Sequence, residues 1–431
     1  MNCENTSKFK QTEIGPIPEG WEVKTVAEIA EIILGGTPKT SIEEFWNGDI
    51  KWASAKDISN CKLRYIYETE KTVTAKGIKN SAAKVLPKNT IVLTSRGTVG
   101  KLVLLPEPMS FNQTCYGIQA KENIDALFLY YNLKNAIEYL KSLSYGTVFS
   151  TITKRTFEEL KLGIPKYGEQ QAIAHSIGTL DQKIELNHSI SHTLEAIAQA
   201  IFKRWFVDFE FPNEHGEPYK SSGGEMVYNE ELGKEIPKEW EVGNIGHIAE
   251  IIMGVSPKGA SYNTTEKGLP LLNGAADFSD DRLVPKKYTT EPTRVCEIGD
   301  IIFCIRGTIG NLTFSNDKYC LGRGVAAISS KDKVYKEFIY FTLKQHLSKM
   351  ITQAAGSVII GLKKDDISNL TFALPLKSVI SYFHKAIKPL FSLKQLFTEE
   401  TESLETIRDA LLPKLMSGEI RVIADNAEGP T

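Results

Sequence analysis

The sequence contains one unit written twice, and this duplication constrains the fold more than any other feature. The segment IPEGWEVKTVAEIAEIILGGTPK, which begins at Ile17, returns as IPKEWEVGNIGHIAEIIMGVSPK at Ile236, 219 residues later. Three further segments return 210 residues later: the segment at Ile91 returns at Ile301, that at Tyr145 returns at Ala355, and that at Thr193 returns at Ser403. The chain of 431 residues is therefore predicted to hold two copies of one unit of about 200 residues.

Each copy begins as a globule and ends as a helix. The globular parts mix β-branched runs, such as Thr90–Leu93 and Asp300–Cys304, with Gly, Pro and Asn turn signals. This texture predicts strands joined by turns and a few helices, which is an α/β globule. The last part of each copy has no glycine cluster and shows a helical period instead.

Both helical segments carry the a/d seam of a coiled coil, with apolar residues at alternating steps of four and three. The seams become polar near their middles, at Asn187 and Ser191 and at Lys394 and Thr401, which costs stability but specifies register. We expect the two helices to pack on each other along the seam residues Ile173, Ile177, Leu180, Ile184, Asn187, Ser191, Leu194, Ala198, Ile201 and Trp205 and Phe383, Ile387, Leu390, Lys394, Phe397, Thr401, Leu404, Arg408, Leu411 and Leu415.

The predicted fold class is α+β: two similar α/β domains separated by a pair of long antiparallel coiled-coil helices, with a pseudo-two-fold internal repeat. Pro389 and Pro413 are expected to kink or interrupt the second helix. The expected boundaries are residues 1–165 for the first globule, 166–210 for the central helix, 211–235 for a connector rich in Gly, Ser, Pro and acidic residues, 236–375 for the second globule and 376–425 for the C-terminal helix.

Signatures of catalysis are absent from the sequence. It has no GxxxxGK[ST] phosphate loop, no HExxH or GxSxG motif and no NPPY-type tetrapeptide of adenine methyltransferases. Glu169 and Asp181 are interpreted as surface charges that complement the helix dipole, and His188 and His192 as part of a solvated helix face without further metal ligands. The six cysteines are scattered, and neither a signal peptide nor a membrane-length apolar run is present. We expect a cytoplasmic, non-enzymatic protein without a metal.

Charge is unevenly distributed along the chain. Overall it has 51 basic and 53 acidic residues. Residues 1–165 carry a net charge of +3 and residues 236–375 a net charge of +2, whereas residues 166–235 carry −6. This is a weak footprint for nucleic acid, but it places any DNA contact on the globules and contacts with protein on the spacer.

Two basic segments recur in both copies. Arg96-Gly97-Thr98 and Arg306-Gly307-Thr308 follow strand-like runs, and an arginine beside a hydroxyl suits phosphate or guanine recognition. Two copies of one domain share structural residues as readily as functional ones, so a structural role for these arginines stays open. The basic loops Lys154-Arg155 and Lys363-Lys364 precede the last strand-like stretch of each globule, where either a phosphate contact or a solvated turn fits.

Residues that read bases should differ between the copies if the two globules read different sequences. The divergent stretches 40–90 and 259–295 are the expected place for them. Residues Gly322 to Ala327 match GxGxxA, which we interpret as a tight turn into a strand. The candidate DNA-binding residues are Lys39, Thr40, Lys56, Arg96, Thr98, Lys101, Lys154, Arg155, Lys258, Asn273, Arg306, Thr308, Arg323, Lys363 and Lys364.

These motifs, in this order, resemble the specificity (S) subunit of type I restriction-modification systems over nearly the whole chain. The resemblance rests on IP-x-x-WE-V with its Gly-Thr-Pro-Lys turn, TSRGTVGK, IPKYGEQQAIAHSIGTLDQKI, FKRWFVDFEFP, KSSGGEMV, the second IP-x-x-WE and LLPKLMSGEIRV. The second copy departs from the pattern after Pro375, where LKSVISYFHKAI replaces the expected Pro-x-x-EQ-x-x-I. The exact start of the second helix therefore stays open.

The resemblance implies that each globule is a target recognition domain that reads one half of a split, asymmetric site in double-stranded DNA, while the helices set the gap. It also implies that the chain is not catalytic, that it docks two methylation subunits, and that motor-nuclease restriction subunits can join the complex. S-adenosylmethionine would bind to the methylation subunits, so this chain needs no cofactor. A fused enzyme would carry methyltransferase motifs. A coiled-coil protein scaffold without DNA reading would leave the recurring arginine loops unexplained.

Overall fold

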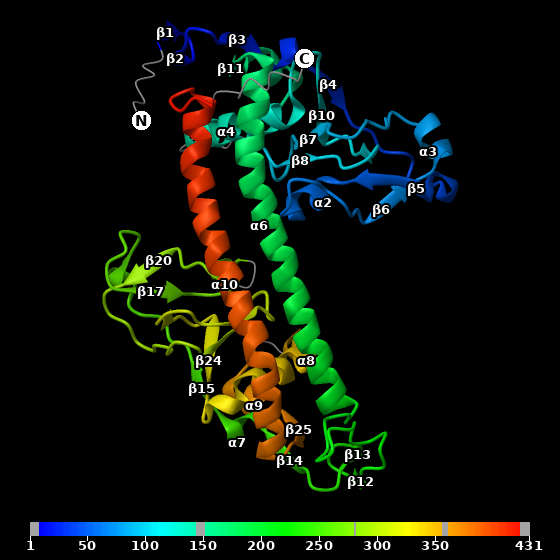
Figure 1. Ribbon diagram of the computed structural model, residues 1–431, viewed down its shortest axis with the longest axis vertical. Helices are drawn as coiled ribbons and strands as arrows, with labels where there is room; N and C mark the ends of the chain where they lie inside the picture. Colours follow the sequence, from blue (N-terminus) through cyan, green and yellow to red (C-terminus); the bar gives the residue numbers. More distant parts are fainter. Residues whose placement is uncertain (1–7, 144–150, 280–281, 356–360, 423–431) are drawn as a thin grey trace, which may run out of the picture. The chain divides into compact units, whose positions relative to one another are not determined.

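The computed structural model describes residues 8–143, 151–279, 282–355 and 361–422. The chain divides into two compact units: unit 1 comprises Met1–Ser189 and Phe397–Thr431, and unit 2 comprises Ile190–Leu396. Two long helices, α6 (Tyr167–Phe202) and α10 (Lys377–Met416), are divided between the units, so that one segment of each helix belongs to unit 1 and the other to unit 2 (Figure 1). A π-helical turn, Lys203–Val207, follows α6.

Unit 1 is built on an antiparallel sheet of four strands in the order β4-β10-β7-β8, which are Ala30–Leu34, Cys115–Ala120, Ile91–Thr94 and Leu102–Leu104. A second sheet, β6-β5-β9, consists of Lys71–Val73, Trp46–Ala53 and Ser110–Phe111, and its strands β5 and β9 are parallel. Two further pairs join β1 (Phe9–Thr12) to β2 (Gly15–Pro18) and β3 (Glu22–Thr25) to β11 (Lys161–Ile164).

Unit 2 repeats this plan. Its antiparallel sheet β15-β24-β21-β22 consists of Ala249–Met253, Val325–Ser330, Ile301–Cys304 and Leu312–Phe314. The sheet β16-β20-β17-β23 consists of Tyr262–Asn263, Lys287–Thr289, Leu269–Leu272 and Cys320–Leu321, with β17 and β23 parallel. The remaining pairs are β14 (Glu241–Asn244) with β25 (Thr371–Leu374), β12 (Met226–Asn229) with β13 (Lys234–Pro237), and β18 (Phe278–Ser279) with β19 (Arg282–Leu283). The matching strand orders confirm the predicted duplication of an α/β globule.

Short helices connect the strands, and side-chain caps begin several of them. Thr25 Oγ1 accepts a hydrogen bond from Glu28 N–H, and Asn244 Oδ1 accepts one from His247 N–H. These bonds begin α1 (Val26–Ile29) and α7 (Ile245–Ile248). The other helices of the globules are α2 (Ala55–Asn60), α3 (Ala75–Lys79), α4 (Ala126–Leu143), α5 (Lys154–Glu159), α8 (Lys336–Ala355) and α9 (Lys364–Ser368), with 3-10 turns at Glu43–Phe45, Gly259–Ser261, Ala275–Asp277 and Lys333–Tyr335.

Two expectations about loops were wrong. Lys154-Arg155 lies in the first turn of α5, and Lys363-Lys364 is the N-cap and first residue of α9, so neither pair lies in a loop. Local hydrogen bonds explain the difference. Asp366 Oδ2 accepts a hydrogen bond from Lys363 N–H at 2.7 Å, which is one half of a capping box.

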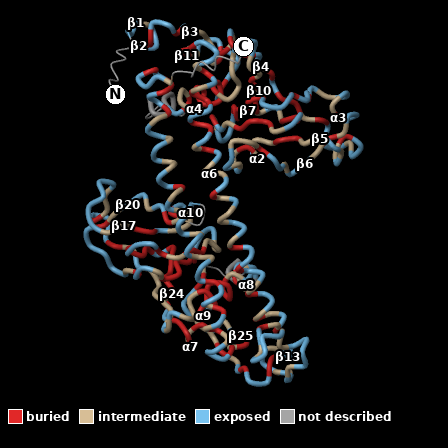
Figure 2. The backbone as a smooth tube through the Cα atoms, in the orientation of Figure 1, coloured by how far each residue is buried: buried red, intermediate tan, exposed pale blue. Residues whose placement is uncertain are grey.

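The predicted helix seam is confirmed within each unit. Every seam residue proposed from the sequence is buried or half-buried, and the burial pattern follows the helical period (Figure 2). In unit 1 the helices are antiparallel, because Asp181 of α6 contacts Arg408 while the later residue Asn187 contacts the earlier residue Thr401. Asn187 Nδ2 also donates to Glu400 Oε2 at 2.9 Å, so this polar seam residue is paired across the helices.

The expected interruption of α10 does not occur. The helix is continuous from Lys377 to Met416 and passes through Pro389 and Pro413. Both prolines are exposed, and so are Lys385 and Asp409, the residues four positions earlier. The carbonyl group that each proline leaves without an N–H donor can therefore be hydrated, which makes a proline tolerable inside a helix. The start of α10 that the sequence left open is Lys377.

The cores join the sheets to the long helices. In unit 1, Phe128 and Tyr131 of α4 pack with Ile173 of α6 and Leu415 of α10. In unit 2 the equivalent core is aromatic, with rings from α6, the π-helical turn that follows it, α8 and α10 at Phe202, Phe206, Phe338, Phe341 and Phe383. The segment predicted as a connector packs on this unit, since Phe211 stacks on Trp240 at 5.0 Å between ring centroids.

Candidate nucleic-acid interface

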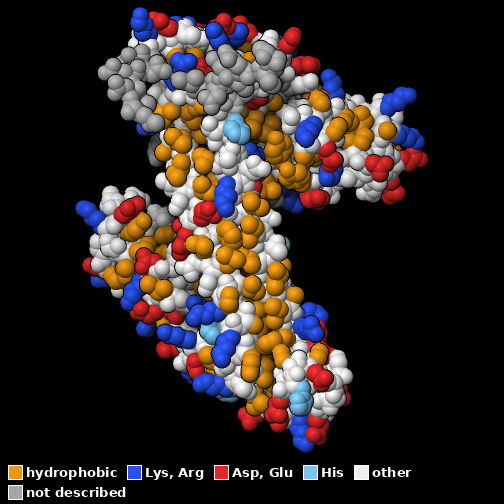
Figure 3. Space-filling view, viewed as in Figure 1, with side chains coloured by type: hydrophobic (Ala, Val, Ile, Leu, Met, Phe, Trp, Pro, Cys, Tyr) orange, Lys and Arg blue, Asp and Glu red, His pale blue; other side chains and the backbone are white. Residues whose placement is uncertain are grey.

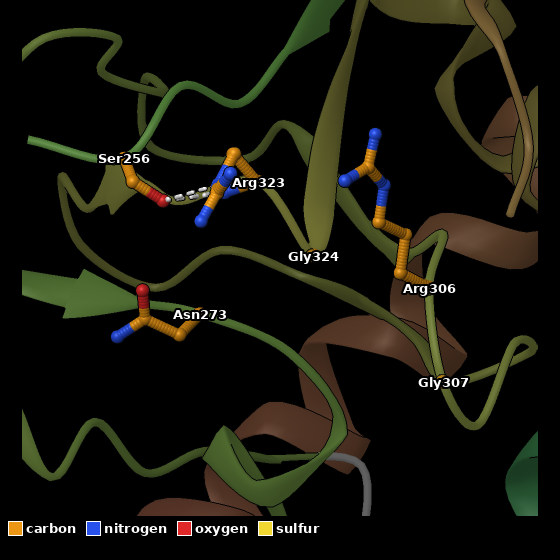
Figure 4. A pocket seen from close by; sticks show the side chains of 6 residues that line it. All are labelled: Ser256, Asn273, Arg306, Gly307, Arg323 and Gly324. Atoms are coloured by element: carbon orange, nitrogen blue, oxygen red, sulfur yellow. Dashed lines mark hydrogen bonds between the residues drawn. The ribbon is translucent and has the colours of Figure 1, made fainter. Parts of the chain in front are cut away.

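Loops at one edge of the sheets of unit 2 surround a pocket of about 420 Å³ (Figure 4). They follow β15, β17 and β21 and precede β24. Because β24 is antiparallel to β15 and β21, its beginning lies beside their ends. The pocket is lined by Ser256, Asn273, Arg306, Gly307, Arg323 and Gly324. The structure thus brings together three of the predicted DNA-binding residues.

Arg323 is oriented by Ser256 in this pocket. Its Nε donates to Ser256 Oγ at 3.3 Å, and its backbone N–H donates to the same oxygen at 3.4 Å (Figure 4). A Cβ atom at Gly324 would lie 1.9 Å from the carbonyl oxygen of Asn273, and one at Gly322 would lie 2.5 Å from its Oδ1. The two glycines therefore let the backbone on either side of Arg323 approach Asn273 closely. The exposed guanidinium keeps its Nη donors for a ligand.

Arg306 supplies the second cation of the pocket. It is exposed, and its guanidinium makes no hydrogen bond or ion pair with the residues that the structure describes. The loop turns at Gly307, whose φ of +73° favours glycine. Arg96 of unit 1 is also exposed and precedes Gly97, whose φ is +75°. The two Arg-Gly-Thr loops thus share a positive φ at the glycine, and each leaves its arginine exposed.

The remaining candidates lie outside the pocket, and all are exposed. Lys258 and Thr308 follow the lining residues Ser256 and Arg306 by two positions each. Other exposed candidates lie in unit 1 or at the start of α9 in unit 2: Lys39, Thr40, Thr98, Lys101, Lys154, Lys363 and Lys364. Two more are engaged in surface ion pairs, Lys56 with Glu70 at 3.0 Å and Arg155 with Glu159 at 2.7 Å.

Sequence reasoning missed three residues, one in this pocket of unit 2 and two at the equivalent place of unit 1. Ser256 lines the pocket, Thr37 is its counterpart in the first copy of the repeat, and Thr37 Oγ1 donates to Gln113 Oε1. Gln113 in turn is the counterpart of Arg323, 210 residues earlier. The signal was present in the aligned turns GGTPK and GVSPK, which carry a hydroxyl residue at the same place.

Both units are similar to one known protein family. A family model described as the type I restriction modification DNA specificity domain matches residues 18–196 and, a second time, residues 237–404. The chain belongs to this family. Its role in DNA sequence specificity follows from that membership, and the resemblance found in the sequence is confirmed.

Relatives match this specificity subunit over nearly its full length. The type I restriction enzyme MjaIX specificity subunit of Methanocaldococcus jannaschii is 34% identical over 96% of this chain and 97% of its own. The putative MjaX specificity subunit of the same organism is 29% identical over 96% and 97%. The crystal structure of a type I restriction-modification S subunit from M. genitalium has a TM-score of 0.57 at 18% identity and covers 96% of this chain and 98% of its own, so the fold is shared.

Two acidic residues of α6 have other roles in the specificity subunit than the sequence predicted. Asp181, expected at the surface, is buried at the seam of unit 1. Its carboxylate accepts hydrogen bonds from Tyr131 Oη at 2.7 Å and from Arg408 Nη1 at 2.8 Å. Glu169 is also more than a dipole complement, since it forms an ion pair with Arg421 and accepts a hydrogen bond from Trp21 Nε1. Their long-range partners have no sequence signal, because they lie far away along the chain.

The described part of the subunit contains no cluster of three or more His, Cys, Asp or Glu side chains that could hold a metal ion. Its five cysteines are free thiols, and burial raises the pKa of Cys115 to about 12 and that of Cys296 to about 11. These two thiols are therefore protonated and unreactive at neutral pH.

Of the helices in the described ranges, none combines the length and apolar character that crossing a membrane requires.

Proposed function

We propose that each unit reads one half of a bipartite, asymmetric DNA site. The observation that carries this proposal is the recurrence of one loop arrangement in both units, with an exposed Arg96 or Arg306 at the same place and different polar side chains beside it. A cation that is identical in both copies suits the phosphate backbone, which is common to all sequences. Side chains that differ between the copies suit different bases.

The helical pair is proposed to set the gap between the half-sites and to dock two methylation subunits. Apolar side chains along the helices support docking. In unit 2, Ile197 of α6 and Leu393 and Leu396 of α10 are exposed, the last to 58%. Figure 3 shows hydrophobic side chains gathered along these helices. Exposed apolar residues grouped on one element indicate a protein interface.

In this proposal the chain itself is not catalytic and works in a complex with the other subunits of the system. S-adenosylmethionine belongs to the methylation subunits, and restriction subunits can join. The support is chemical: the sequence lacks the NPPY-type tetrapeptide that an adenine methyltransferase uses. A methylation subunit would take the adenine out of the DNA stack to methylate it. This chain would deliver that subunit to its site.

A methylation map tests the proposal. The chain would be co-expressed with its cognate methylation subunit in a bacterium free of DNA methylation, and the DNA sequenced by a modification-sensitive single-molecule method. We expect a new split motif with methyladenine in both halves, which is absent when this chain is omitted. Exchange of residues 8–165 for another target recognition domain should change one half of the motif. A stable complex that gives no new methylation would overturn the proposal in favour of a protein scaffold.

A further inference from the structure

Residues 113 and 323 occupy the same backbone position in the two units. The carbonyl oxygen of the residue before each position accepts a hydrogen bond: that of residue 112 from the N–H of residue 115 at 3.1 Å, and that of residue 322 from the N–H of residue 325 at 3.2 Å. The carbonyl oxygen of the residue after each position also accepts one: that of residue 114 from the N–H of residue 95 at 2.8 Å, and that of residue 324 from the N–H of residue 305 at 2.9 Å. Residues 95 and 305 directly precede Arg96 and Arg306. These bonds align the two positions by geometry and not by sequence identity alone.

The backbone and hydroxyl contacts next to residues 113 and 323 are also alike in the two units. A Cβ atom at Gly35 would lie 2.1 Å from the carbonyl oxygen of residue 112, and one at Gly254 would lie 2.1 Å from that of residue 322. Both glycines therefore allow the same close approach of two backbone segments. A hydroxyl side chain, Thr37 or Ser256, lies two residues after each glycine. It forms a hydrogen bond with the side chain of residue 113 or residue 323.

The side chain that this hydroxyl group supports differs between the units: it is Gln113 in unit 1 and Arg323 in unit 2. Both are exposed, so neither is needed to fill a core. With Nε engaged by Ser256, Arg323 presents its Nη donors. Gln113 presents its amide N–H groups and a second lone pair on Oε1. Arginine pairs two acceptors of guanine, and glutamine pairs the acceptor and donor of adenine, in the major groove.

We infer that this position determines base specificity in each half-site, with Arg323 reading guanine and Gln113 reading adenine, and with Ser256 and Thr37 as positioning residues. The inference rests on the proposed function and deepens it. Residues that are the same in both units cannot distinguish two half-sites. Arg306 and Arg96, which stand beside the position in both units, therefore serve as common anchors, and the discrimination lies with the side chain that varies.

Exchanging the two side chains tests the inference. Methylation maps would be recorded for wild type, Arg323→Gln and Gln113→Arg, each co-expressed with the methylation subunit. We expect Arg323→Gln to change or relax one guanine position in one half-site and to leave the other half-site unchanged. Gln113→Arg should alter one adenine position in the other half-site. The preference for the original base should fall about 10- to 100-fold, as expected for loss of one bidentate contact.

Two further variants separate reading from charge and from orientation. Lys318→Gln removes one positive charge from an exposed side chain of the same unit that does not line the pocket, and its motif should equal that of wild type. Ser256→Ala leaves Arg323 in place without its orienting oxygen, so the same position should relax to a smaller extent than in Arg323→Gln. Thermal unfolding of each purified chain checks that the fold is retained.

The outcomes distinguish this inference from the proposed function. If wild type gives no split motif, the proposed function itself fails. If wild type gives a motif and both exchanged variants give the identical motif at the same efficiency, the inference is wrong. If Arg323→Gln abolishes methylation, binding is measured with duplexes that carry each base at each half-site position. Equal weakening on all duplexes would make Arg323 a phosphate contact and overturn the inference, whereas lost discrimination at one position supports it.

Discussion

Three side chains converge on the carboxylate of Glu195, which is 7% exposed in unit 2. Tyr340 Oη donates to it at 2.8 Å, and the ammonium groups of Lys344 and Lys394 form ion pairs with it. Burial opposes the charged form of Glu195, but Lys394 and Lys344 outweigh this effect and lower the pKa of the carboxyl to about 2. The network joins α6, α8 and α10 through one charge.

This carboxyl should make the stability of the protein depend on acid pH. Its pKa is lower in the folded chain than the ordinary value of about 4.3, so its contribution is complete above that value and is lost as pH falls through about 2. We expect the unfolding free energy of wild type to decrease between about pH 5 and pH 2, and this part of the decrease to vanish in Glu195→Gln. Denaturant unfolding at a series of pH values measures it.

Glu195→Gln should also be costly at neutral pH. It leaves two ammonium groups against a neutral side chain, and breaking a buried pair from one side costs about 2–4 kcal/mol here, because Lys344 is partly exposed. Glu239→Gln is the matched control, since Glu239 lies in the same unit and is exposed, so the change should alter stability by less than about 0.5 kcal/mol. Equal effects of the two variants would contradict the assigned role of Glu195.

At the scale of the elements, the buried charges distinguish the two long helices. In both units the buried acid of the seam is on α6, as Asp181 or Glu195, and its basic partner is on α10, as Arg408 or Lys394. Charges arranged in this way favour pairing of α6 with α10 over pairing of either helix with a second copy of itself. The hydrophobic seam alone does not make this distinction, because its spacing is the same in both helices.

The continuous α10 predicts a stabilising substitution. Pro389 lies in the helix interior, is exposed and leaves the carbonyl of Lys385 without a backbone donor. Pro389→Ala restores that bond but makes the unfolded chain more flexible, so we expect a net gain of about 1–2 kcal/mol. Thermal or denaturant unfolding measures it, with the neighbouring exposed Lys388→Ala as a control near zero. A loss of stability in Pro389→Ala would show that the proline conformation is needed there.

At the scale of the whole molecule, the proposed spacer role can be tested by length. Removing one heptad from α6 and the matching heptad from α10 shortens each helix by about 10.5 Å, which corresponds to about three base pairs. We expect the gap of the methylated motif to shorten by about three base pairs while both half-sites stay the same. Replacing the same heptads with others of equal length and equal seam pattern should leave the gap unchanged. Methylation with the original gap after deletion would refute the spacer role.

Binding of the whole complex to DNA should fall steeply with salt, although the chain as a whole has a net charge of −2. Contacts between arginine or lysine and phosphates release counterions, so the logarithm of the binding constant falls linearly with the logarithm of the salt concentration. Arg96→Gln and Arg306→Gln should each reduce this slope by about one if the arginines contact phosphates. Fluorescence anisotropy with a duplex that contains the mapped motif measures the slope, and an unchanged slope in both variants would remove the arginines from the interface.

The sequence by itself determined the duplication, the α/β character of each copy, the helix seam and the family. These features are periodic or repeated, so each is supported by many residues, and one residue that departs from the pattern does not change the prediction. Tertiary structure decided the features that depend on distant partners: the burial of Asp181 beside Arg408, and the placement of Thr37 under Gln113 and Ser256 under Arg323. The expectation that base-reading residues lie in the divergent stretches stays a prediction; of the residues that line the pocket, Asn273 lies in one of these stretches. Gln113 and Arg323, the proposed base-reading residues, lie outside these stretches. Antiparallel strand pairing brings the start of the strand that follows each of them beside the end of another strand. No local sequence pattern predicts that proximity.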